Sequence, residues 1–231
     1  MHVPDGFLDL PMSIATGVVA VGGIALALKR APSEYVDDRK APMVGIVATV
    51  VFAAQMINFP VGVGTSGHLM GGALAAVLVG PATAVLCLSV VLIVQAFLFT
   101  DGGITALGTN ITLIALVTVI IGWLVFRALL LALPARRWSV VAAAAAGAFL
   151  SVPAASAVFA LLFAIGGQAP VPFGGLLAAM IGWHSIIGVG EAVITGLIVS
   201  AVLATRPDLV YGARFVRGGR ILTATPAKPL A

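Results

Sequence analysis

Long apolar stretches separated by short polar segments dominate the order of residues along this chain. A helix needs about 20 apolar residues to cross a hydrocarbon core of roughly 30 Å, because each residue adds about 1.5 Å. The fold class we expect is an all-α integral membrane protein, a bundle of about seven transmembrane helices. The apolar stretches predict spans at residues 11–28, 41–58, 66–80, 82–100, 104–126, 138–165 and 173–205.

Two of the predicted spans have unusual lengths. The stretch 66–80 is short for a full crossing, whereas 173–205 is longer than a crossing requires. We therefore expect the third stretch to lie partly in the outer interface and the last one to be broken or strongly tilted. A break would fall at Gly182, Gly188 or Gly190.

Composition excludes several classes of protein. Hydrophobic residues make up 61% of the chain and charged residues only 9%, which rules out an ordinary soluble domain. The single cysteine, Cys87, excludes a disulfide framework and a thiolate metal cluster. The basic residues are confined to one side of the predicted topology, so the net positive charge does not indicate a nucleic-acid partner.

The positions of the charges predict the orientation in the membrane. Basic residues are retained in cytoplasmic loops. All twelve lie after the first predicted span, after the fifth or in the C-terminal tail: Lys29, Arg30, Arg39, Lys40, Arg127, Arg136, Arg137, Arg206, Arg214, Arg217, Arg220 and Lys228. The N-terminus is then outside and the C-terminus cytoplasmic, as expected of a multi-pass protein of the inner (plasma) membrane. The opposite face contains Asp5, Asp9 and Asp101. An acidic outer mouth favours a cationic substrate.

Polar groups inside a membrane bundle are costly and are kept where they have a function. The three histidines are therefore the first candidates for residues with a chemical role. His2 and His68 both fall on the outer side, and His184 falls in the last span. If the amine of Met1 is free, then this amine, the amide nitrogen of His2 and the His2 imidazole can chelate one ion. A nitrogen of His68 would complete a square, a geometry that suits Ni(II) or Cu(II) better than zinc, calcium or magnesium.

Other polar residues could support such a site. His184 and Glu191 are seven residues apart, so an unbroken helix places them on nearly one face. For His184, a structural role in packing is as compatible with this spacing as a role beside a metal. For Glu191 we expect a role in holding helices together. Asp101, which precedes two glycines, is interpreted as part of a turn. The remaining candidates for a polar network are Gln55, Asn58, Ser66 and Asn110.

Three motifs resemble the CbiM/NikM family, over most of residues 1–205. They are Met1-His2-Val3-Pro4-Asp5-Gly6-Phe7-Leu8, Gly64-Thr65-Ser66-Gly67-His68-Leu69-Met70-Gly71-Gly72-Ala73-Leu74-Ala75-Ala76 and His184-Ser185-Ile186-Ile187-Gly188-Val189-Gly190-Glu191. The family comprises the substrate-capturing (S) membrane subunits of energy-coupling factor transporters for cobalt and nickel. The resemblance implies metal ligands from Met1, His2 and His68, with Ni²⁺ or Co²⁺ as substrate and no further cofactor.

The resemblance also implies an organisation and partners. We expect a metal-capturing membrane domain at 1–205, made of an outer N-terminal metal loop at 1–10 and a helical bundle at 11–205, followed by a basic cytoplasmic tail at 206–231. The implied partners are a transmembrane coupling (T) subunit, ATP-binding cassette ATPases and a small accessory membrane subunit encoded separately. No Gly-x-x-x-x-Gly-Lys-Ser/Thr loop occurs, so we expect a non-catalytic subunit whose partners hydrolyse ATP.

A different function remains as an alternative. The segment Gly64-Thr65-Ser66-Gly67 matches the Gly-x-Ser-Gly pattern of rhomboid-like intramembrane serine proteases, with His184 as the base. This alternative gives no role to Met1, His2 or His68. The choice between nickel and cobalt also stays open, since a square of nitrogens favours nickel whereas the family serves both metals.

Overall fold

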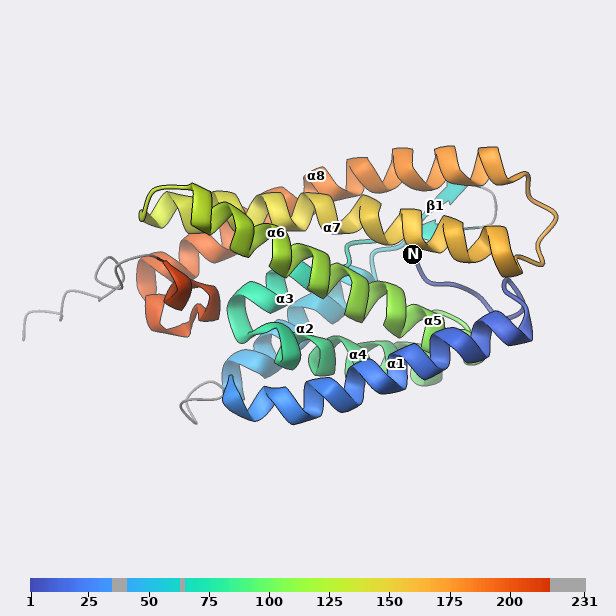
Figure 1. Ribbon diagram of the computed structural model, residues 1–231, viewed down its shortest axis with the longest axis horizontal. Helices are drawn as coiled ribbons and strands as arrows, with labels where there is room; N and C mark the ends of the chain where they lie inside the picture. Colours follow the sequence, from blue (N-terminus) through green and yellow to red (C-terminus); the bar gives the residue numbers. More distant parts are fainter. Residues whose placement is uncertain (35–40, 63–64, 217–231) are drawn as a thin grey trace, which may run out of the picture.

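The computed structural model describes residues 1–34, 41–62 and 65–216, and these form a bundle of helices (Figure 1). Five helices in this part of the chain are long and apolar enough to cross a membrane. They are α1 (Leu10–Arg30), α4 (Pro81–Leu98), the continuous helical segment Leu107–Ala132, α7 (Arg137–Gly166) and α8 (Phe173–Thr205). The all-α membrane fold predicted from the sequence is confirmed.

The segment Leu107–Ala132 changes its winding along its length. It begins as α5 (Leu107–Asn110), continues as a π-helix, η3 (Ile111–Val117), and ends as α6 (Thr118–Ala132). A π-helical stretch inside an α-helix is rare and is found most often at functional sites. Here it starts directly after Asn110, a buried polar residue.

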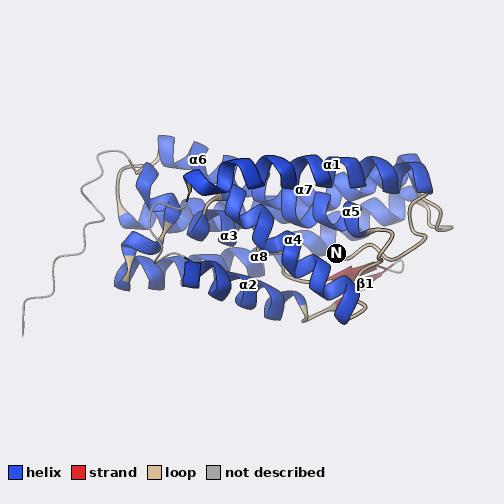
Figure 2. Ribbon diagram, turned by 90° about the horizontal axis from the view of Figure 1, so that it is seen from below, coloured by secondary structure: helices blue, strands red, loops and turns tan. Residues whose placement is uncertain are grey.

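Shorter elements complete the bundle. Helix α2 (Ala41–Gln55) is apolar but has only 15 residues. Strands β1 (Phe59–Gly62) and β2 (Thr65–Gly67) pair antiparallel at the end of the bundle near the N-terminal segment (Figure 2). Short 3₁₀ helices in the described residues are η1 (Ala31–Ser33), η4 (Pro207–Leu209) and η5 (Tyr211–Phe215).

The span predicted at 66–80 is wrong. This stretch contains β2, an extended connection and α3 (Gly72–Val79), a helix of eight residues. Eight residues rise only about 12 Å, which is far too short for a crossing. Every residue of α3 is buried, so its apolar composition reflects packing inside the protein rather than contact with lipid.

The predicted break in the last span is also absent. Helix α8 runs unbroken for 33 residues beside α7, which itself contains Pro153 (Figure 1). A Cβ atom added at Gly188 would lie 2.8 Å from the carbonyl oxygen of Phe149 on α7, whereas Gly182 and Gly190 face no protein atom within 4 Å. Gly188 therefore permits close approach of two helices instead of interrupting one.

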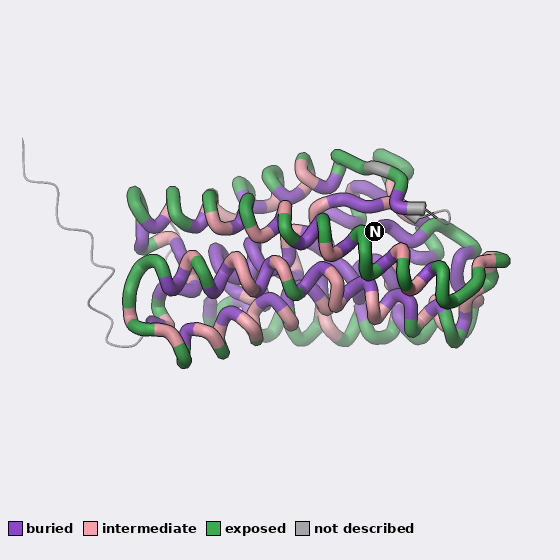
Figure 3. The backbone as a smooth tube through the Cα atoms, turned by 90° about the horizontal axis from the view of Figure 1, so that it is seen from above, coloured by how far each residue is buried: buried purple, intermediate pink, exposed green. Residues whose placement is uncertain are grey.

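Exposed residues follow the outer sides of the helices (Figure 3), and many of them have large apolar side chains. Large exposed examples are Leu10, Val18, Val21, Leu98, Ile165 and Leu197. Such a surface suits a lipid environment, where a helix loses nothing by presenting apolar side chains. Five of the basic residues on which the predicted orientation rests, at positions 39, 40, 217, 220 and 228, lie outside the described residues, as does Gly64.

The first residues of the predicted tail contact the bundle. Val210, Ala213 and Val216 are buried, and the guanidinium of Arg127 lies 3.8 Å from the ring centroid of Phe215. Residues 207–216 thus cover the end of the bundle at which α6 ends.

Two glycines of α8 give a matched test of this packing. We expect Gly190→Ala to raise the free energy of unfolding by about 0.5–1 kcal/mol, because alanine favours helix and position 190 faces open space. We expect Gly188→Ala to lower it by roughly 1–3 kcal/mol, because the new methyl group would collide with main chain. Thermal unfolding in one detergent measures both, and equal effects would contradict the close α7–α8 contact.

Candidate metal centre

The N-terminal segment enters the bundle instead of extending away from it. Met1 and Val3 are each 1% exposed and His2 is 6% exposed. Figures 1 and 3 place the N-terminus among the helices, at a distance from either end of the bundle. The first three residues are therefore part of the protein core.

Asn110 holds this segment by its main chain. The N–H of Val3 donates to Oδ1 of Asn110 at 2.7 Å, and Nδ2 of Asn110 donates to the carbonyl of Val3 at 3.2 Å. The N–H of Gly103 donates to the same carbonyl at 2.9 Å. Buried main-chain groups need such partners, and these three bonds fix the direction in which residues 1 and 2 point.

The outer part of the segment is fastened at separate points. The Asp5 carboxylate accepts hydrogen bonds from the N–H and the hydroxyl of Thr105. The ring of Phe7 stacks against Phe159, with 5.8 Å between ring centroids. Asp9 caps α1, because its Oδ1 accepts the N–H of Met12 at 2.8 Å.

The structure brings His2 and His68 together. Their rings are stacked, with centroids 4.3 Å apart and an angle of 24° between planes. His68 lies between β2 and α3, and its Nδ1 is 2.8 Å from the carbonyl oxygen of Leu69. If Nδ1 carries the proton that this bond requires, Nε2 keeps a free lone pair.

Asp101 is the anionic neighbour of His2. Its Oδ1 lies 3.1 Å from Nδ1 of His2, and its Oδ2 accepts a hydrogen bond from Nδ2 of Asn58 at 2.9 Å. Asn58 follows α2 and Asp101 follows α4, so two separate connections meet beside the His2 ring. The turn predicted at Asp101 therefore also provides a carboxylate that faces the candidate site.

Burial keeps the basic nitrogens of the cluster uncharged. It lowers the pKa of the Met1 amine to about 4, although the negative charges of Asp101 and Glu191 act in the opposite direction. Burial also lowers the pKa values of His2 and His68. At neutral pH these groups present lone pairs rather than protons, which is the state that a metal ion requires.

Several buried polar atoms around the amine lack a hydrogen-bond partner among the described residues. They are Nδ1 and Nε2 of His2, Nε2 of His68, Nε2 of His184, Oε1 of Gln55 and Oε1 of Gln95. Buried polar atoms are nearly always paired. The amine is within electrostatic reach of all three imidazoles, so these nitrogens belong to one region of the bundle.

Side chains alone do not form a metal site in the described part of the chain. No three or more histidine, cysteine, aspartate or glutamate side chains there are grouped so that they could hold an ion. The Met1 amine and the His2 amide are main-chain nitrogens of this cluster that could act as further ligands.

Of the other predicted site residues, one belongs to the cluster and two have other contacts. His184 belongs to the cluster, with its Nδ1 2.8 Å from the carbonyl oxygen of Met180. Glu191 binds the main chain that follows His68, as described below. Ser66 is paired with Pro60 in the two strands, and no hydrogen bond within the described residues joins it to His184. The protease alternative finds no support in this geometry.

Sequence reasoning missed the role of Asp101 and named Asn110 only as a network candidate. The available signal for Asp101 was its acidic charge on the predicted outer face. The signal for Asn110 was an amide inside an otherwise apolar span, where polar groups mark function or interhelical contact.

Fold and cluster together define a polytopic helical membrane protein with a nitrogen-rich interior site at its N-terminus. The chain belongs to the family described as "Cobalt uptake substrate-specific transmembrane region", which matches residues 2–209. The resemblance seen in the sequence motifs is confirmed.

Individual relatives agree with this family. The chain is 38% identical to a putative metal transport protein of Haloquadratum walsbyi, over 91% of this chain and 94% of that one. It is 35% identical to a putative fused nickel transport protein, NikMN, of Archaeoglobus fulgidus, over 91% of this chain and 68% of the relative. A crystal structure of a truncated transition metal transporter has a TM-score of 0.81 and 30% identity, covering 88% of this chain and 99% of that chain.

The protein is thus a multi-pass membrane protein of cobalt and nickel transport, and the inner membrane is the usual location of such transporters. The protease alternative has no support from these relatives either.

Asn110 offers a test of the N-terminal anchor. Asn110→Ala removes both side-chain bonds to Val3, so we expect the amine of Met1 to react with an amine-directed reagent at least several-fold faster. Thr112→Val is the matched control, because it removes one bond from Thr112 to the carbonyl of Thr16 in α1 and none to the N-terminal segment. Mass spectrometry of the labelled N-terminal peptide measures the rates, and equal labelling of both variants would contradict the anchor.

Proposed function

We propose that this chain is the substrate-capture subunit of an ATP-driven importer of nickel or cobalt ions. The metal would be held by the Met1 amine, the His2 amide nitrogen, Nδ1 of His2 and Nε2 of His68. The observation that supports this most strongly is a buried N-terminus beside two stacked imidazoles, in which Nδ1 of His2 and Nε2 of His68 lack hydrogen-bond partners among the described residues.

The proposed chelate follows from the connectivity of the first two residues. The amine and the amide of residue 2 close a five-membered ring on a metal, and the amide and Nδ1 of His2 close a six-membered one. Because Nδ1 of His2 faces Asp101, the imidazole must turn away from this carboxylate to bind. The bond between Nδ1 of His68 and the Leu69 carbonyl would orient Nε2 toward the fourth position.

Charge favours a cation at this point. A divalent ion bound to one deprotonated amide keeps one net positive charge, and an unpaired charge inside a bundle is costly. Asp101 and Glu191 are the carboxylates within electrostatic reach of the amine. Asp101, whose Oδ1 lies 3.1 Å from Nδ1 of His2, would offset the charge of the ion without occupying a ligand position.

The metal itself follows from the geometry only in part. Four nitrogens in a square suit Ni(II) and Cu(II). A relative is named as a nickel transport protein and the family description names cobalt. We therefore propose nickel or cobalt as substrate.

Transport would depend on other chains. The sequence contains no phosphate-binding loop of the Gly-x-x-x-x-Gly-Lys-Ser/Thr type. We propose that a coupling subunit and ATP-binding cassette ATPases, with a small accessory membrane subunit, supply the energy. Release inward requires movement of the N-terminal segment or of the connection that carries His68, because the ion would otherwise stay enclosed.

Lengthening the chain tests the proposed ligands directly. One alanine added before Met1 turns its amine into an amide and moves the new amine by about 3.8 Å. We expect nickel affinity, measured by isothermal titration on purified protein, to fall at least 100-fold. The same alanine added after Ala231 is the control and should have no effect. Unchanged affinity in the N-terminal variant would contradict the chelate.

Substitutions distinguish the transporter from the protease alternative. His68→Ala should lower nickel affinity by more than tenfold, whereas Ser66→Ala should leave it within about twofold, since the removed hydroxyl has no place in the chelate. A protease would show the reverse: loss of function in Ser66→Ala and labelling of that serine in the original protein by a fluorophosphonate.

The pH dependence of binding reports which nitrogens lose protons. The amine, with a pKa of about 4, and both histidines are already neutral at pH 7, so only the amide should release a proton. Affinity should therefore rise about tenfold per pH unit between pH 7 and 8, by mass action for one proton. Titrations in buffers of different ionisation enthalpy count the protons. Release of none would exclude the amide, and release of two would show that the amine is not buried as a neutral group.

A further inference from the structure

The connection between His68 and α3 is held by side chains from two different helices. Met70 is fully buried, and its N–H donates to Oε1 of Glu191 on α8 at 2.9 Å. Its carbonyl accepts a hydrogen bond from Nε2 of Gln55 on α2 at 2.8 Å. Main-chain groups that would pair with other main chain in a helix or sheet are satisfied here by α2 on one side and α8 on the other.

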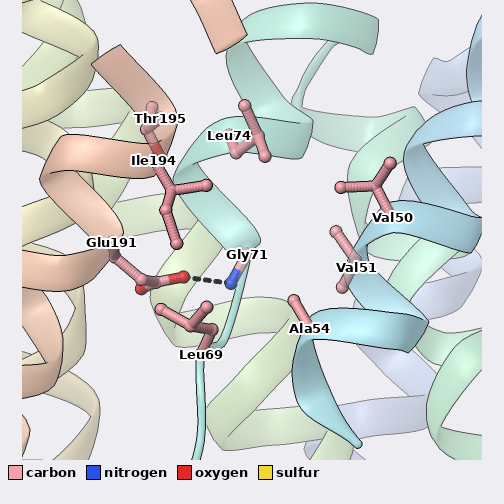
Figure 4. A pocket seen from close by; sticks show the side chains of 9 residues that line it. All are labelled: Val50, Val51, Ala54, Leu69, Gly71, Leu74, Glu191, Ile194 and Thr195. Atoms are coloured by element: carbon pink, nitrogen blue, oxygen red, sulfur yellow. Dashed lines mark hydrogen bonds between the residues drawn. The ribbon is translucent and has the colours of Figure 1, made fainter. Parts of the chain in front are cut away.

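Glu191 makes two of these contacts with one atom. The same Oε1 also accepts the N–H of Gly71, as Figure 4 shows. Gly71 has φ of +78°, and a Cβ added there would lie 2.7 Å from a methyl carbon of Val51. The connection therefore turns sharply at the point where the carboxylate holds it.

The surroundings leave Glu191 little freedom. Its side chain borders a small cavity of about 20 Å³ between α2, α3 and α8, enough for one water molecule. The residues that line this cavity are mostly apolar: Val50, Val51, Ala54, Leu69, Gly71, Leu74, Glu191, Ile194 and Thr195 (Figure 4). Among the described residues no other carboxylate lines this cavity, so none of them could replace Glu191 in these contacts.

We propose that Glu191 is a positioning residue that fixes His68 for metal binding, and that Gln55 completes this hold from the opposite helix. His68 is separated from Met70 by one residue, so the two anchored N–H groups determine where its Nε2 can lie. A shift of α8 relative to α2 would pull this connection apart and withdraw His68 from the metal. The inference rests on the proposed function and assigns the control of affinity to α8.

Variants of Glu191 separate positioning from charge. Glu191→Gln keeps an acceptor oxygen for both N–H groups but removes the negative charge. Glu191→Met has similar bulk and no acceptor. If the role is positioning, nickel affinity in Glu191→Gln should stay within about threefold of the original, whereas in Glu191→Met it should fall 10- to 100-fold.

Gln55→Met is an independent second variant. It removes the bond to the Met70 carbonyl from the other side, and we expect its affinity to fall in the same direction. Thr195→Val is the control, because Thr195 lines the same cavity without a hydrogen bond to the connection in the described residues. The visible absorption band of the bound Ni(II) provides a readout of ligand geometry, and it should weaken or shift in Glu191→Met and not in Glu191→Gln.

Three outcomes would overturn the inference. The first is an equal loss of affinity in Glu191→Gln and Glu191→Met, which would show that charge matters. The second is no loss of affinity in either variant. The third is an unchanged absorption band in Glu191→Met. If Glu191→Met does not fold, Gln55→Met and Glu191→Gln still decide the question by affinity. The alanine extension before Met1 distinguishes failure of this inference from failure of the proposed function. Affinity that is unchanged by the extension contradicts the proposed chelate itself.

Discussion

A neutral amine inside a helical bundle is the constraint on which the candidate site depends. A charged ammonium without a counter-ion would be costly at that depth, so burial of Met1 favours its uncharged form. The same burial requires that every main-chain group of the entering segment be paired. Asn110 and Gly103 provide those partners at Val3, and Asp5 and Phe7 fasten the segment farther out. The result is an amine held in a defined place inside the bundle.

The short buried helix α3 and the connection that precedes it are explained by the same requirement for pairing. Irregular main chain at membrane depth is tolerated only where protein covers it. The connection after His68 meets this condition, because Glu191 and Gln55 form hydrogen bonds with its main-chain groups and α3 is wholly buried. Interior placement also explains why an apolar stretch of chain contains a histidine and several glycines. Close contacts, such as that of Gly72 with Thr118, leave no room for larger residues there.

Much of the fold was predictable from sequence, because long apolar stretches specify helices such as α4, α7 and α8 to within a few residues. The segment 66–80 was misread because apolarity does not distinguish a helix in lipid from a short one covered by protein. Met1 and His2 could be proposed because they adjoin in sequence, and His68 because its motif resembles a family. The contacts of Asp101 and Asn110 join residues about 100 positions apart, and no local pattern encodes them.

X-ray absorption at the nickel edge of the loaded protein tests the central proposal most directly, because it reports the atoms bound to the metal. The proposed chelate predicts four nitrogen ligands in a square-planar arrangement, two of them imidazoles, with no sulfur. Substitution His68→Ala should remove one imidazole from that set. A six-coordinate shell rich in oxygen, or a sulfur ligand from the Met1 thioether, would contradict the account.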